Sequence, residues 1–170
     1  SVVFCNPQAA NKRKYGTPGM PCGVEARVVS TENSAVLAEG HTGELQLRGA
    51  NVMRGYFNAA DKTAEAITED GWLRTGDLGH RDADGFYFVT GRIKELIIKG
   101  GENIAPREID EALLAHPAVL EAAAVGIPDA NYGQEILAAV VLKPGAVCDE
   151  VALREHCIAM LGRFKTPKTF

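Results

Sequence analysis

The chain has 170 residues, of which 46% are hydrophobic, so it can bury the core of one ordinary domain or of two small ones. Its formal net charge of -4 is small and both signs are interspersed, which argues against nucleic acid as a partner. No apolar stretch approaches the ~20 residues that cross a bilayer, so we expect no transmembrane segment.

Cysteine and histidine usage bounds the chemistry further. The four cysteines contain no C-x-x-C pair and the four histidines show no metal-ligand spacing, so we expect no metal site. Thiols of this kind fit the reducing cytoplasm. The chain starts with the apolar residues 2–4 and has no initiator Met, so we also expect it to be cut from a longer protein.

Short strands separated by turns are predicted through the first half. Residues 24–28 and 44–48 both alternate apolar with polar side chains, as half-buried strands do. Further predicted elements are a short helix at 63–67, a turn into a strand at 70–74, a turn at 82–85 and a strand at 86–89.

After Gly91 the pattern changes to alternating strands and helices, which predicts a domain boundary between residues 92 and 93. Predicted elements are a strand at 93–98, a helix from Pro106 to 116, strands at 119–127 and 136–142, and a helix capped by Asp149. The last helix is expected to bury one stripe, formed by Leu153, Cys157, Met160 and Leu161.

These elements predict an α+β chain in two parts. Residues 1–92 form a β-rich part like the edge of a barrel or sandwich. Residues 93–170 form a small α/β domain with helices packed on a small sheet.

Residues 70–79, DGWLRTGDLG, form the first candidate site. A carboxylate held in a turn at a strand end can accept two hydrogen bonds from the adjacent hydroxyls of a ribose, because it offers only acceptors. Asp77 is the candidate for this role. Asp beside Gly is also ordinary turn chemistry, so on its own the stretch leaves both interpretations open.

Two more stretches lie at and after the predicted boundary. In residues 90–94, TGRIK, Arg92 could bind ribose or phosphate through its fork of donors, or be a surface arginine at a strand end. Residues 99–106, KGGENIAP, form a strand-turn-helix junction whose paired glycines permit close approach of a ligand, or simply a tight turn. Neither a Walker motif nor a G-x-G-x-x-G fingerprint is present, which argues against a self-contained nucleotide fold.

Taken together, five stretches in order resemble the adenylate-forming enzyme superfamily, which includes acyl-CoA synthetases, peptide-synthetase adenylation domains and firefly luciferases. The stretches are GTPGMPCGVE at 16–25, GELQLRG at 43–49 with GYFN at 55–58, GWLRTGD at 71–77, GRIKE at 91–95 and GGENI at 100–104. The resemblance covers nearly the whole chain and points to an AMP-forming acyl-CoA synthetase.

The resemblance implies that ATP, a carboxylic acid and CoA give acyl-CoA, AMP and pyrophosphate, with Mg²⁺ in the full-length enzyme. It implies that residues 1–92 are the barrel-like end of a large AMP-binding domain and residues 93–170 a small mobile domain. By it, Asp77 and Arg92 hold the ribose and Lys94 is the hinge. Gly100, Gly101, Glu102 and Asn103 line the pantetheine path.

The resemblance also implies what the chain lacks. The phosphate loop and the Mg²⁺ ligands would lie upstream, and residues 164–170, FKTPKTF, would lead toward a catalytic lysine that the sequence does not reach; Lys168 is not that lysine. No catalytic residue is therefore expected in the chain, and we expect it to be inactive by itself.

Two alternative functions stay open. The chain could be part of a peptide-synthetase adenylation domain. It could instead be a non-catalytic interaction module that pairs with a partner. Surfaces exposed by truncation could also form a homo-oligomer.

Overall fold

The chain divides into two compact units, Ser1–Ile93 and Lys94–Phe170. The computed structural model describes residues 3–170, so the start of the apolar stretch 2–4 lies outside the described residues. The division falls after Ile93, next to the position at which the sequence pattern changes. The assignment of the two units to domains of a larger enzyme stays a prediction.

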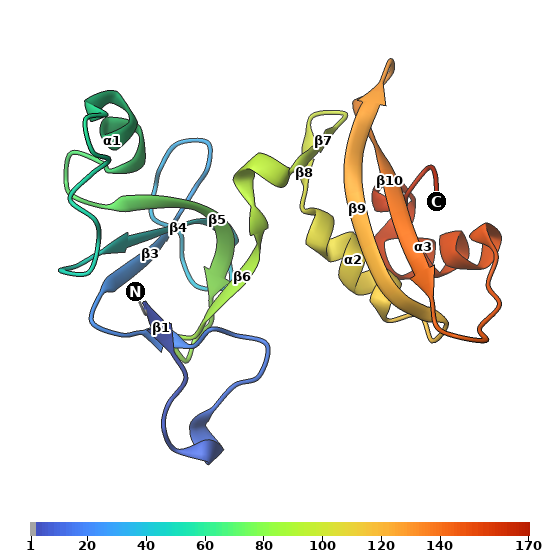
Figure 1. Ribbon diagram of the computed structural model, residues 1–170, viewed down its shortest axis with the longest axis horizontal. Helices are drawn as coiled ribbons and strands as arrows, with labels where there is room; N and C mark the ends of the chain where they lie inside the picture. Colours follow the sequence, from blue (N-terminus) through green and yellow to red (C-terminus); the bar gives the residue numbers. More distant parts are fainter. Residues whose placement is uncertain (1–2) are drawn as a thin grey trace. The chain divides into compact units, whose positions relative to one another are not determined.

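The first unit is built on an open antiparallel sheet (Figure 1). Its elements are β1 (Phe4–Cys5), the 3-10 helix η1 (Ala10–Lys12), β2 (Met20–Pro21), β3 (Glu25–Val29), β4 (Gly43–Arg48), α1 (Ala60–Ala66), β5 (Leu73–Arg81) and β6 (Tyr87–Arg92). Strands β3, β4, β5 and β6 are neighbours in chain order, and β1 and β2 form a separate ribbon. Within the described residues, the expected barrel-like part is thus an open four-stranded sheet.

One face of this sheet forms the core of the first unit. Val28 of β3 lies directly opposite Leu45 of β4, and both are buried with Tyr87 of β6. The Tyr87 hydroxyl donates to the carbonyl of Ala26 at 2.7 Å, so the polar end of this buried ring is satisfied.

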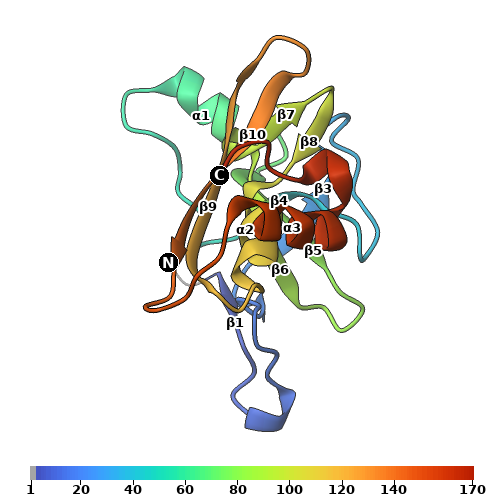
Figure 2. The same cartoon turned by 90° about the vertical axis from the view of Figure 1, so that its right-hand side faces the viewer.

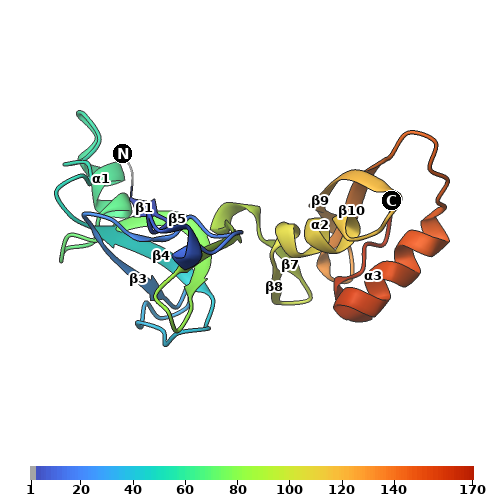
Figure 3. The same cartoon turned by 90° about the horizontal axis from the view of Figure 1, so that it is seen from below.

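The second unit packs two helices on a second antiparallel sheet. After the 3-10 helix η2 (Ile93–Glu95) come β7 (Ile97–Lys99), β8 (Glu102–Ile104), α2 (Pro106–Leu114), β9 (Val119–Asp129), β10 (Gly133–Leu142) and α3 (Glu150–Lys165). The strand order is β8-β7-β10-β9. Figures 2 and 3 show α2 and α3 side by side over this sheet.

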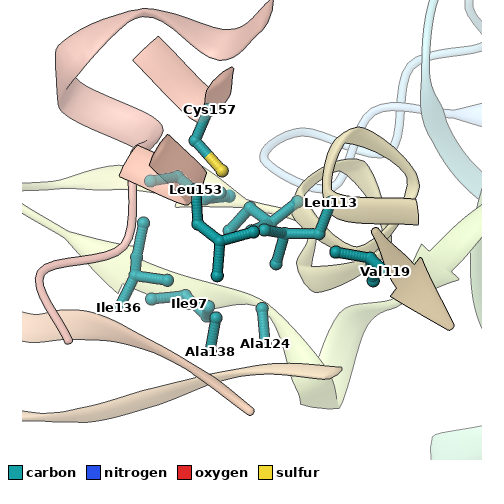
Figure 4. Packing of buried hydrophobic residues seen from close by; sticks show 10 residues of the cluster. Ile97, Leu113, Val119, Ala124, Ile136, Ala138, Leu153 and Cys157 are labelled. Carbon is teal, nitrogen blue, oxygen red and sulfur yellow. The ribbon is translucent and has the colours of Figure 1, made fainter. Parts of the chain in front are cut away.

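Its core lies between the helices and alternate residues of the strands (Figure 4). Ala124 and Ala138 are direct partners across β9 and β10 and are both buried, as are Leu113 of α2 and Leu153 of α3. Asp149 caps α3 as predicted, its Oδ1 accepting from the amide of Ala152 at 2.8 Å.

The predicted stripe on α3 is only partly right. Leu153 and Cys157 are buried, but Met160 is 58% exposed. Gly162, with φ of +77°, breaks the helix in its last turn and turns the chain toward β10. Residues 168 and 169 then add to β10, where the Lys168 amide donates to the carbonyl of Ile136 at 2.9 Å.

Two local predictions are wrong. The apolar run 93–98 is not one strand, since η2 occupies its first half and β7 begins at Ile97. Residues 99–106 are not a direct strand-turn-helix junction either, because the short strand β8 lies between the turn and α2. Short apolar runs carry no periodicity that separates these outcomes.

The α+β class itself is confirmed. Within residues 3–170, no helix is long and apolar enough to cross a membrane.

Candidate functional site

Asp77 lies on a bulge inside β5 and not, as predicted, in a turn at a strand end. Glu44 pairs with Leu78 and Gln46 pairs with Arg74, so residues 75–77 of β5 all face the single residue Leu45 of β4. Gly76 supplies the left-handed conformation that this excursion needs, with φ of +71°. The bulge lifts Asp77 out of the regular ladder between β4 and β5.

Thr75 fixes the bulge from within. Its hydroxyl donates to the carbonyl of Leu45 at 2.7 Å and accepts from the amide of Asp77 at 3.0 Å. This one side chain replaces ladder bonds that the bulge interrupts. Sequence reasoning did not single out Thr75, although a hydroxyl two residues before an Asp is a usual turn signal.

Asp77 and Arg92 are brought together, as neighbours across β5 and β6. The Arg92 Nε lies 3.1 Å from the Asp77 Oδ1, and their side chains are 66% and 30% exposed. An exposed pair of this kind is worth about 0–1 kcal/mol, so a competing ligand can open it cheaply. A carboxylate with a guanidinium beside it can bind a diol and a nearby anionic group together.

The predicted hinge residue Lys94 is exposed and is the first residue of the second unit, in the single turn η2 that begins at Ile93. Of the four predicted thiol-path residues, Gly100 and Gly101 form the turn of the β7–β8 hairpin in the second unit, and Glu102 and Asn103 begin β8. Gly100 and Gly101 have φ of +56° and +86°, and two consecutive positive values are typical of a tight type I′ turn.

The two glycines differ in what surrounds them. A Cβ on Gly100 would lie 3.2 Å from the Tyr132 ring and 3.4 Å from the Phe164 ring, whereas a Cβ on Gly101 would meet nothing within 4 Å. The Gly100 amide also donates to the carbonyl of Tyr132 at 2.9 Å. Gly100 is therefore the packed side of the turn, and Gly101 faces open space beside the exposed Glu102.

A buried ion pair lies beside the turn of the hairpin. The Lys99 Nζ is 2.5 Å from the Glu135 Oε1 and donates to the carbonyl of Phe164 at 2.8 Å, and both charged side chains are 7% exposed. Such a pair is costly to break because either charge alone would be buried without a partner. Sequence reasoning missed it, since Lys99 and Glu135 are far apart in the chain.

The neighbouring β9–β10 turn carries the most displaced carboxyl pKa of this unit. The Lys168 ammonium at 2.9 Å, with the amides of Asn131 and Tyr132, lowers the pKa of Asp129 to about 2. Asp129 thereby fixes the turn that places Tyr132 under Gly100.

A metal site is not assembled by the described part of the chain. Among residues 3–170, no three His, Cys, Asp or Glu side chains gather closely enough to hold an ion.

Two family models match the chain. Residues 1–57 match the model described as AMP-binding enzyme, and residues 108–170 match the AMP-binding enzyme C-terminal domain. The chain belongs to the AMP-binding enzyme family. The predicted resemblance to adenylate-forming enzymes is thus confirmed.

Curated relatives and solved structures of AMP-binding enzymes agree with this. A sulfoacetate–CoA ligase of Cupriavidus necator is 60% identical over 99% of the chain, which covers 33% of that protein. The crystal structure of ATP-bound MatB from Rhodopseudomonas palustris has a TM-score of 0.91 and 36% identity over 97% of the chain and 33% of MatB.

The structure of O-succinylbenzoate coenzyme A synthetase (MenE) from Bacillus subtilis, in complex with AMP, has a TM-score of 0.78 and 36% sequence identity. The match covers 92% of the chain and 32% of MenE. The chain spans about a third of the length of these AMP-binding enzymes.

Proposed function

We propose that the chain supplies the ribose contact and the thiol-path hairpin of an AMP-forming acyl-CoA synthetase. In that reaction a carboxylic acid attacks the α-phosphate of ATP, giving an acyl-adenylate and pyrophosphate, and the thiol of CoA then displaces AMP. The observation that carries the proposal is the bulge that sets Asp77 beside Arg92. The names of the relatives, which are CoA ligases, support the same chemistry.

In the first half-reaction Asp77 accepts hydrogen bonds from the ribose hydroxyls. The carboxylate oxygens accept hydrogen bonds, and the largely exposed pair with Arg92 opens at little cost. Arg92 then remains near the ribose. In this proposal the chain supplies no Mg²⁺ ligand and no residue that acts on the carboxylic acid or on the α-phosphate.

In the second half-reaction the β7–β8 hairpin borders the route of the pantetheine thiol. Gly101 leaves the route open, and Glu102 and Asn103 offer polar groups to it. Lys94, in the single turn η2, is the proposed hinge of the small domain that carries this hairpin.

A chimeric ligase tests the proposal. In it, this chain replaces the matching third of the Cupriavidus necator sulfoacetate–CoA ligase, and 60% identity makes the graft compatible with that host. The host supplies the residues outside the matched third, so sulfoacetate is the acid to assay. We expect sulfoacetyl-CoA formation, while the 170-residue chain alone should catalyse no acid-dependent exchange of pyrophosphate into ATP. A folded chimera that forms neither adenylate nor thioester would refute the proposed function.

A further inference from the structure

A buried carboxylate lies directly beneath the Asp77 bulge. Glu44 of β4 is 9% exposed and its neighbour Gln46 on the same strand is 2% exposed. Among residues 3–170, Glu44 has no ion-pair partner within 4 Å, so hydrogen bonds alone satisfy its two oxygens.

A relay of hydrogen bonds runs from Arg27 through these two side chains to the bulge. The Arg27 Nε donates to the Gln46 Oε1 at 2.9 Å, and the Gln46 Nε2 donates to the Glu44 Oε2 at 3.0 Å. The Glu44 Oε1 then accepts from the amide of Gly76 at 3.3 Å. Gly76 is the bulge residue immediately before Asp77.

The direction of this relay is fixed at both ends. A guanidinium and a backbone N–H can only donate, so one side chain between them must accept on both sides. A glutamine at position 44 cannot do this, because it has one acceptor oxygen and one NH₂ group. If its oxygen accepts from the Gly76 N–H, its NH₂ faces the Gln46 NH₂; in the opposite orientation its NH₂ faces the Gly76 N–H. Rotating the Gln46 amide by about 180° does not restore the pairing, because its NH₂ would then face the Arg27 guanidinium, which is also a donor.

The relay also connects the two ends of the motif at residues 70–77. The Arg27 guanidinium stacks on the Trp72 ring, with 4.2 Å from its Cζ to the ring centroid, and lies 3.6 Å from the Asp70 Oδ2. Arg27 therefore holds the start of the motif, and Glu44 holds Gly76 near its end.

We propose that Glu44 is a positioning residue for nucleotide binding, acting through the Gly76 amide to set the place of the Asp77 carboxylate. The ribose role of Asp77 belongs to the proposed function, and the positioning role rests on it. Glu44 itself touches no substrate.

The first arm of the test needs no activity. In the 170-residue chain labelled with ¹⁵N, Glu44→Gln should increase hydrogen exchange at the Gly76 amide by about tenfold, because this half-buried donor loses its acceptor. The double variant Glu44→Gln/Gln46→Glu exchanges the two side chains and lets every donor again meet an acceptor, so protection should return. Glu25→Gln, on the neighbouring strand and exposed, is the matched control and should change nothing at Gly76. Unchanged exchange in Glu44→Gln, or a double variant no better than the single one, would overturn the proposal.

The second arm uses the chimeric ligase. Glu44→Gln should raise the KM for ATP by about tenfold, the KM for sulfoacetate should not change, and the double variant should restore the ATP value. If Asp77→Ala weakens ATP use but Glu44→Gln does not, the positioning proposal is wrong and the proposed function stands. If neither variant changes ATP use, the ribose assignment itself fails and the positioning role fails with it, whatever the exchange at Gly76.

Discussion

The Asp77 side chain is accessible to a ligand and contributes little to the stability of the fold. Its pair with Arg92 is exposed and worth about 0–1 kcal/mol, so Asp77→Ala should leave the stability of the first unit nearly unchanged. Hydrogen bonds to a charged group contribute about 1.5–3 kcal/mol, so in the chimeric ligase the KM for ATP should rise about 10- to 100-fold. Pyrophosphate exchange measures this directly.

The control for Asp77 is Asp84→Ala. Asp84 is a 70% exposed aspartate of the same unit, paired with Lys14. It should leave ATP use unchanged. Equal ATP dependence of the two variants would remove Asp77 from the ribose site.

Asp129 gives the second unit a contribution to stability that is lost at low pH. Its folded pKa of about 2 lies below the unfolded value of about 3.9, so its contribution to stability is present above pH ~3.9 and is lost as the pH falls toward 2. Asp129→Asn should therefore flatten the pH dependence of the free energy of unfolding in this window. Urea unfolding followed by the amide signals of β9 and β10 measures it.

Asp110 is the matched control because burial raises its pKa and gives it the opposite sign. Asp110→Asn keeps an oxygen that can accept from the Ala124 amide, and it should make the loss of stability on acidification steeper only above pH ~3.9, outside the Asp129 window. An Asp129→Asn variant with the slope of the unmodified chain would contradict the prediction.

At the scale of elements, long patterned segments were predictable and short irregular ones were not. Pro106 and Asp149 identified the starts of α2 and α3, because a proline at the first helical position and an N-terminal cap act locally. The β5 bulge was not predictable, because three residues of one strand face one residue of another. The same holds for the Glu44 relay, whose members come from three strands.

The candidate site divides in the same way. The motifs located Asp77, Arg92 and the Gly100–Gly101 turn, since glycine spacing is visible in the sequence. Their supports were not visible: Glu44 under the bulge, and the Lys99–Glu135 pair beside the hairpin turn. These supports depend on contacts between segments far apart in the chain.

The linker between β6 and β7 should be the least protected backbone near the unit boundary. Strand β6 pairs with β5 through Arg92, so the unprotected stretch should begin only at Ile93 and end before Ile97. One turn of 3-10 helix has few bonds to lose, and we expect its amides to exchange faster than those of both flanking strands. Hydrogen exchange resolved by residue measures this, and protection at residues 93–96 equal to that in β6 would argue against a hinge at Lys94.

At the scale of the whole molecule, each unit has its own sheet and its own core. The two proposed roles are separated in the same way, with the ribose contact in the first unit and the thiol-path hairpin in the second. A substitution on the hairpin should therefore separate the two half-reactions, provided that it does not unfold the unit.

Gly101 is the position for that substitution, and Gly101→Ala is the control for Gly101→Leu. Its φ of +86° is strained for any other residue except Asn or Asp, so Gly101→Ala and Gly101→Leu share the backbone cost, while only Leu adds bulk to the open space beyond the turn. The decisive measurement is the rate of both half-reactions in the chimeric ligase carrying each variant. We predict that Gly101→Leu retains pyrophosphate exchange and loses about 100-fold in sulfoacetyl-CoA formation, with Gly101→Ala much closer to the unmodified chimera. Equal loss of both half-reactions, equal effects of Ala and Leu, or no loss in either would contradict the assignment of the hairpin to the thiol path.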